Sequence, residues 1–176
     1  MSKTLFRTCV AATALLISGA SEARSEQGLI VHKALSLDMA MAMTQGSLAK
    51  CRELRYKCAV TVLDASGRTI IALQDDGANL HRFDVARKKA YTALVYRRPS
   101  KEVVEGWSKK TAGPVPLAEG TMPSPPIEGT IAMGGGIPIV VDQETIGAIA
   151  VSGGPNWDAD EACSKAGLAK VADKLK

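Results

Sequence analysis

Two pairs of short apolar runs, each pair joined by only a few turn-forming residues, constrain the fold of this chain most. The four runs, rich in β-branched residues, are residues 58–63, 68–73, 137–141 and 146–151. The first pair flanks the turn Asp64–Gly67, and the second flanks a turn at Asp142–Glu144. Strands joined by so short a connection pair antiparallel, because a parallel pair needs a crossover of about a dozen or more residues. The sequence therefore excludes a doubly wound parallel sheet.

We expect four helices around these runs, the first two from apolar or small residues that recur at helical spacing, and the last two from acidic residues in the first turn. The expected helices are residues 35–54, 83–96, 101–109 and 158–175. A further short strand is expected at residues 130–133, whereas residues 111–126 hold five prolines and no period, which predicts a surface loop. This order predicts an α/β (α+β) domain. We expect an antiparallel sheet of about five strands, with the first and last helices packed together on one of its faces.

The first 23 residues have the layout of a secretory signal peptide. Lys3 and Arg7 precede the apolar run Cys9–Ile17, and small residues stand at Ser21 and Ala23, after which we predict cleavage. The run is about half the roughly 20 residues that a membrane-spanning helix needs. The alternative, a buried amphipathic helix, lacks a polar face. We therefore expect a periplasmic or secreted product without a membrane span.

The predicted product has an N-terminal tail at residues 24–34 and one domain at residues 35–176. Cleavage would leave 20 basic and 17 acidic residues, a net charge of +3, interspersed along the chain. A nucleic-acid-binding protein usually carries a concentrated basic stripe, so we expect no nucleic-acid partner. Three cysteines remain, Cys51, Cys58 and Cys163, so at most one internal disulfide can form, and export favours it.

Two features could carry binding chemistry. The run Gly134–Gly136 beside a predicted strand could let backbone amides approach a flat or anionic ligand, or it could be an ordinary glycine-rich turn. It lacks the lysine of a phosphate-binding loop and opens no helix, which argues against a nucleotide. His81, just before a predicted helix, could ligate iron or act as a base, or it could be a polar residue at the helix start. No catalytic constellation accompanies them.

The densest positive region surrounds the second predicted helix. By default these cations form a solvated surface, because successive helical positions point in different directions. A subset near His81 could pair with carboxylates of a ligand. The set comprises Arg82, Arg87, Lys88, Lys89, Arg97 and Arg98.

Five strings, taken in order, resemble the GlcG/HbpS family of haem-binding proteins. They are Val62–Gly67, Asp76–Ala78, Ala86–Ala93, Gly134–Ile139 and Ile146–Gly153. The resemblance covers roughly residues 35–175. It implies a profilin-like domain that self-associates into a homo-oligomer and binds haem for sequestration, sensing, transfer or breakdown.

The resemblance also implies a site. His81 would ligate the haem iron, with Tyr91 and Met133 as substitute donors, and Arg82 and Arg87 would meet the propionates. Gly134, Gly135 and Gly136 would allow close approach of the ligand, and an apolar wall would come from Met122, Ile131, Met133 and Ile137.

With the first and last helices side by side, a Cys51–Cys163 disulfide is preferred over Cys51–Cys58, which would leave Cys58 reduced in its strand. The resulting hypothesis is an exported haem-binding protein that is not an enzyme. The alternatives are an enzyme that degrades haem or another small molecule, and a sensor or partner module whose true ligand is not haem.

Overall fold

The computed structural model describes residues 31–109 and 127–175, and one compact unit begins at His32. The predicted signal peptide, most of the predicted tail and the proline-rich residues 111–126 lie outside the described residues. Within the described part, no helix is long and apolar enough to cross a membrane.

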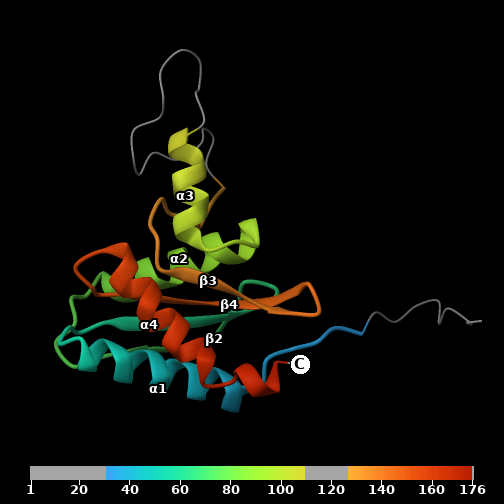
Figure 1. Cartoon of the computed structure of the whole chain (residues 1–176), viewed down its shortest axis with the longest axis horizontal. Helices are drawn as coiled ribbons and strands as arrows, with labels where there is room; N and C mark the ends of the chain where they lie inside the picture. Colours follow the sequence, from blue (N-terminus) through green and yellow to red (C-terminus); the bar gives the residue numbers. More distant parts are fainter. Residues whose placement is uncertain (1–30, 110–126, 176) are drawn as a thin grey trace, which may run out of the picture. The chain divides into compact units, whose positions relative to one another are not determined.

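Four helices and four strands make up this unit (Figure 1). In chain order they are α1 (Leu37–Glu53), β1 (Ala59–Asp64), β2 (Thr69–Gln74), α2 (Arg82–Tyr96), α3 (Ser100–Lys109), β3 (Gly136–Val141), β4 (Glu144–Ser152) and α4 (Trp157–Ala169), followed by a 3₁₀ turn at Ala172–Lys174. The sheet order is β2-β1-β4-β3, and every neighbouring pair is antiparallel. Both predicted hairpins are confirmed, and the α+β class is confirmed with them.

The period-two alternation of β1 and β4 gives the sheet two different faces. Val60, Val62 and Ile149 pack into the core beneath α1 and α4, which lie side by side as the sequence predicts (Figure 1). On the opposite face, Ala148 and Ala150 pack with the alanines of α2. These short side chains let α2 approach the sheet closely.

The expected fifth strand at residues 130–133 is not a strand. Met133 N donates to Ile131 O at 3.0 Å, which closes a tight turn within the segment. Thr92 of α2 supplies the partners that a neighbouring strand would supply, because its hydroxyl accepts from Ile131 N at 2.9 Å and lies 3.2 Å from Ile131 O. The described sheet therefore has four strands, and the prediction of about five is wrong.

The disulfide joins Cys51 to Cys58, with Cα atoms 6.5 Å apart, so the preferred Cys51–Cys163 pairing is wrong. After α1 the chain reverses at Arg55, which has a φ of 62°, and Tyr56 N donates to Cys51 O at 3.1 Å. This reversal brings the start of β1 back to the end of α1. Cys163 stays reduced and buried, with its sulfur 3.2 Å from the Tyr56 hydroxyl.

Candidate functional site

A cavity of about 270 Å³ lies where the start of α2, the end of β4 and the start of α4 meet. Three of the predicted site residues, His81, Arg82 and Met133, line it together. The full lining is His81, Arg82, Val85, Lys89, Met133, Ser152, Gly154, Pro155, Asn156, Trp157 and Asp160. We call this hollow the His81 cavity. It combines cations, an imidazole and apolar side chains in one place.

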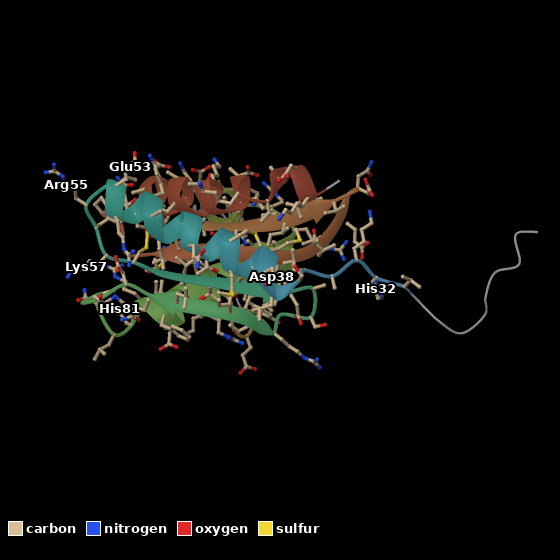
Figure 2. All side chains as sticks on the ribbon, turned by 90° about the horizontal axis from the view of Figure 1, so that it is seen from below. His32, Asp38, Glu53, Arg55, Lys57 and His81 are labelled. Carbon is tan, nitrogen blue, oxygen red and sulfur yellow. A yellow bond between two sulfur atoms is a disulfide. The ribbon has the colours of Figure 1, made fainter. Side chains whose placement is uncertain are left out.

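His81 occupies the position just before the first residue of α2, and its side chain makes no capping hydrogen bond. The residue is exposed and lies at the same end of the molecule as Glu53 and Arg55 (Figure 2). Its imidazole is therefore accessible to a ligand. Among residues 31–109 and 127–175, no three His, Cys, Asp or Glu side chains come together as a metal-binding group.

The segment that leads to His81 is anchored at its start. Asp75, which is buried, accepts from Nη2 of Arg52 at 2.7 Å and from its Nε at 3.1 Å. These hydrogen bonds and the positive charge of Arg52 hold the pKa of the Asp75 carboxyl below its ordinary value of 3.8, against the opposing effect of burial. The pair ties the end of β2 to the last turn of α1.

A buried ion pair forms the floor of the His81 cavity. Lys89 Nζ lies 2.6 Å from Asp160 Oδ2, and both side chains are almost fully buried. Asp160 Oδ1 also accepts from the backbone N–H groups of Gly153 and Gly154, at 3.0 and 2.7 Å. Burial lowers the pKa of Lys89, and the attraction of Asp160 opposes that shift. The pair joins α2 to α4 under the cavity.

Sequence reasoning missed this pair, because it treated Lys89 as one of several surface cations. A signal was present in the helical spacing. Lys89 shares a face of α2 with Ala86, Ala90 and Ala93, all of which are buried. A lysine among buried small residues on one helix face indicates that its side chain lies inside the packed protein and not on the surface.

Ser152 adds an unpartnered polar atom to the cavity wall. Its side chain is fully buried, and its hydroxyl makes no hydrogen bond within the described part of the chain. A buried hydroxyl without a partner destabilises the folded state, typically by about 1–3 kcal/mol.

The three predicted glycines lie next to the cavity rather than in its lining. A Cβ added at Gly134 would come within 2.9 Å of the Cβ atoms of Lys101 and Trp157. A Cβ at Gly136 would collide with the backbone oxygen of Lys89. Gly135, with a φ of 120°, accepts at its oxygen from the Ser164 hydroxyl at 2.7 Å. The run brings β3, α2 and α4 together around the site.

The remaining predicted residues lie elsewhere. Arg87 is exposed on α2 and is not part of the cavity lining. Tyr91 lines a different hollow, farther along α2. Ile137 packs in the core beneath α1 and α4, so it cannot form a wall of the His81 cavity. Met122 lies outside the described residues.

Residues 35–169 match the protein family described as "Haem degrading protein HbpS-like". The chain belongs to the HbpS-like family. The match spans the whole compact unit apart from its two ends, so the described helices and strands are those of an HbpS-like domain.

A bacterial protein is similar to this chain over about two thirds of the chain's length. A Citrobacter freundii protein, described as an uncharacterized 15.0 kDa protein in the dhaT-dhaS intergenic region, is 28% identical over 128 residues, which cover 68% of this chain and 80% of that protein.

Solved structures of similar proteins share the fold. The crystal structure of HbpS is 26% identical, with a TM-score of 0.69 over 80% of this chain and 92% of HbpS. A complex of PduOC with haem is 23% identical, with a TM-score of 0.67 over 78% of this chain and 95% of PduOC.

Proposed function

We propose that this HbpS-like chain is an exported protein that binds haem at the His81 cavity. The observation that carries the proposal is the accessible His81 imidazole at a cavity that also presents a cation and apolar surface. Haem needs these three things: an axial donor for its iron, cations for its propionates and an apolar wall for the macrocycle. His81 would supply the donor, Arg82 the cation, and Met133 and Trp157 part of the wall.

The size of the cavity supports partial insertion of the haem. Its volume of about 270 Å³ lies below the roughly 300–1,000 Å³ of pockets that enclose a drug-sized ligand. Leu80 and Phe83, which flank the imidazole in sequence, are 93% and 38% exposed and would extend the apolar surface outside the cavity. In this proposal one edge of the haem enters the cavity, and a second copy of the chain covers the rest, which gives a homo-oligomer.

Export rests on the signal-peptide pattern of residues 1–23, and a disulfide in the described domain supports it. Disulfides persist in oxidising compartments such as the periplasm and are rare in the cytosol. Fractionation of cells that express the full chain tests this part. A product that stays in the cytosol with its first 23 residues attached would contradict it.

Haem titration into the product of residues 24–176 tests the binding proposal. We expect a shift of the Soret band that saturates at micromolar haem, and a weaker, altered spectrum in His81→Ala. His32→Ala is the matched control, because His32 is exposed and lies beside Glu144, with no part in the cavity. No Soret shift with the unaltered chain would contradict haem binding. An unchanged titration of His81→Ala would contradict the assigned ligand.

The description of the family favours haem degradation as a second candidate function. Incubation of the haem complex with ascorbate and oxygen separates the two. A degrading enzyme would bleach the Soret band in a protein-dependent way. A binding protein would protect the band, relative to haem in buffer.

A further inference from the structure

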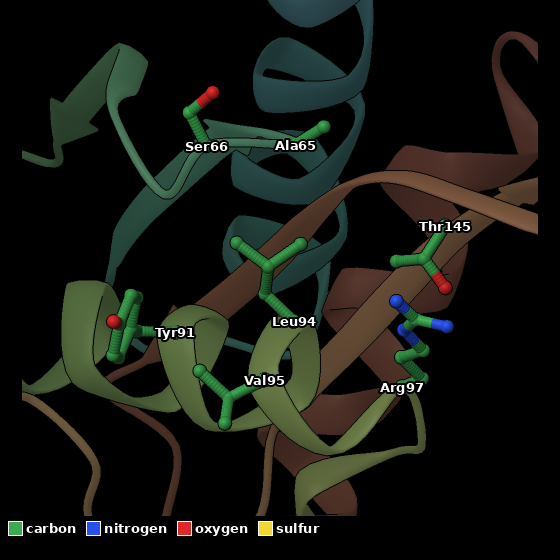
Figure 3. Close-up of a pocket in the computed structure, with 7 residues that line it drawn as sticks. All are labelled: Ala65, Ser66, Tyr91, Leu94, Val95, Arg97 and Thr145. Carbon is green, nitrogen blue, oxygen red and sulfur yellow. The ribbon is translucent and has the colours of Figure 1, made fainter. Parts of the chain in front are cut away.

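We propose that a second hollow, on the C-terminal half of α2, binds a small carboxylate with a compact apolar body. This hollow, which we call the Tyr91 cavity, has a volume of about 240 Å³. It is lined by Ala65, Ser66, Tyr91, Leu94, Val95, Arg97 and Thr145 (Figure 3). None of these residues lines the His81 cavity, so the proposal stands independently of haem binding.

The aromatic wall of the Tyr91 cavity is held rigidly. A Cβ at Gly67 would lie 2.8 Å from Cε2 of Tyr91, and a Cβ at Gly129 would lie 3.2 Å from Cδ1 and Cε1 of the same ring. Both glycines have a positive φ, of 78° and 83°. The backbone at Gly67 and at Gly129 therefore packs directly against the ring, and each segment can lie this close only because it has no Cβ there. A wall fixed before the ligand arrives loses little conformational freedom on binding.

Arg97 supplies the charge. It ends α2 in the left-handed conformation, with φ 51° and ψ 35°, which is uncommon for a residue other than glycine. Figure 3 shows its guanidinium directed toward the side chain of Thr145. In the described part of the chain Arg97 has no ion-pair partner, whereas the adjacent Arg98 lies 3.6 Å from Glu102. A planar guanidinium without a partner is suited to bind a carboxylate through two hydrogen bonds.

The rest of the lining sets the chemistry of the ligand. Ala65, Leu94 and Val95 add apolar surface to that of the ring, although polar groups make up the larger part of the exposed lining, and none of the described residues that line the cavity is acidic. The hydroxyls of Tyr91 and Thr145 make no hydrogen bond with the described residues, so they can serve further polar atoms of the ligand. One cation beside an apolar wall in so small a volume fits a single carboxylate on a small ring or branched alkyl group.

Calorimetric titration with benzoate, and with the neutral benzyl alcohol, tests the proposal. We expect benzoate to bind with a Kd on the order of millimolar or tighter, and benzyl alcohol to bind about tenfold or more weakly. Arg97→Asn should weaken benzoate binding about tenfold, because a charge-assisted pair is lost. Asparagine is chosen because it tolerates the left-handed backbone. Tyr91→Phe keeps the clamped ring and removes only its hydroxyl.

Arg98→Asn is the matched control, since Arg98 is the neighbouring exposed arginine and lies outside the cavity lining. It should leave the Kd for benzoate unchanged. Equal binding of benzoate and benzyl alcohol, equal weakening by both arginine substitutions, or no binding at about 10 mM benzoate would each overturn the proposal. Benzoate should leave a haem-loaded Soret band unchanged. Displacement of haem by benzoate would place benzoate in the His81 cavity. That result would overturn the proposed Tyr91 site but would not contradict the proposal that the protein binds haem.

Discussion

Lys89 Nζ lies 2.6 Å from Asp160 Oδ2 in a buried ion pair that joins α2 to α4 beneath the His81 cavity. Both side chains are almost fully buried. Because removal of one member leaves the other charge buried and uncompensated, such a pair is sensitive to single substitutions. The two elements that frame the cavity therefore depend on each other for their placement.

We expect Lys89→Met to lower the free energy of unfolding by about 3–5 kcal/mol, because Asp160 would keep a buried charge. Urea unfolding at neutral pH measures this. Lys88→Met is the control, since Lys88 is the adjacent exposed lysine of α2, and its loss should change stability by less than about 0.5 kcal/mol. The double variant Lys89→Met/Asp160→Asn should be less unstable than the sum of its single variants. Equal effects of the two lysine substitutions would contradict the structural role.

The Lys89 side chain shows where prediction from the sequence reaches its limit. Helical spacing located α2 to within a residue, and the two hairpins were read from their turns. The partner of Lys89 lies 71 residues away in the sequence, on α4, so the two residues meet only through tertiary packing. Local patterns determine the elements, whereas the pairing of buried charges depends on their packing.

The cysteines show the same limit. Packing of α1 against α4 was predicted and confirmed, and it made Cys51–Cys163 a reasonable pair. The choice between partners depends on two local details, the left-handed Arg55 and the Tyr56 hydroxyl, which donates to Ala159 O at 2.9 Å and lies beside the Cys163 sulfur. Neither detail follows from periodicity or composition.

The disulfide can be checked by mass spectrometry of a non-reduced tryptic digest. We expect the dipeptide 51–52 to be linked to the peptide 58–68, because Lys50, Arg52, Lys57 and Arg68 are cleavage sites. Replacement of both linked cysteines by serine should lower the free energy of unfolding by roughly 2–3 kcal/mol, through the freedom gained by the unfolded chain. A peptide that contains Cys163 joined to Cys51 would contradict this pairing.

Cys163 should resist alkylation by iodoacetamide in the folded protein at pH 8 and react after unfolding in urea. Burial raises the pKa of its thiol, so little of the reactive thiolate is present, and the sulfur is also shielded from the reagent. Counting labelled cysteines with and without urea, by intact mass, measures this. Rapid labelling of the folded protein at Cys163 would show that the interface between α1 and α4 opens readily.

The ion pair between Arg52 and Asp75 should stabilise the folded protein by an amount that depends on pH. Because the pKa of Asp75 is lowered in the folded state, its contribution is present above the ordinary value of 3.8 and is lost as the pH falls through the lowered pKa. We expect Arg52→Gln to destabilise the protein at pH 7 and the difference from the unaltered chain to shrink below pH 3.8. Arg68→Gln, at an exposed arginine without an ion pair in the described domain, is the control. A difference that is constant with pH would refute the ion pair.

Gly136 and Gly106 should respond in opposite directions to replacement by alanine. At Gly136 an added Cβ would collide with the backbone oxygen of Lys89, and a backbone atom cannot move aside as a side-chain end can. We expect Gly136→Ala to lower the free energy of unfolding by about 1–3 kcal/mol, the usual range for overpacking, and to push α2 away from β3.

At Gly106, in α3, nothing lies within 4 Å of the added Cβ, so alanine should stabilise the helix by about 0.5–1 kcal/mol. Unfolding curves of the two variants test this, and haem titration of Gly136→Ala asks whether the floor of the His81 cavity moves with α2. If Gly136→Ala were as stable as the unaltered chain, the close approach of α2 to β3 would be wrong.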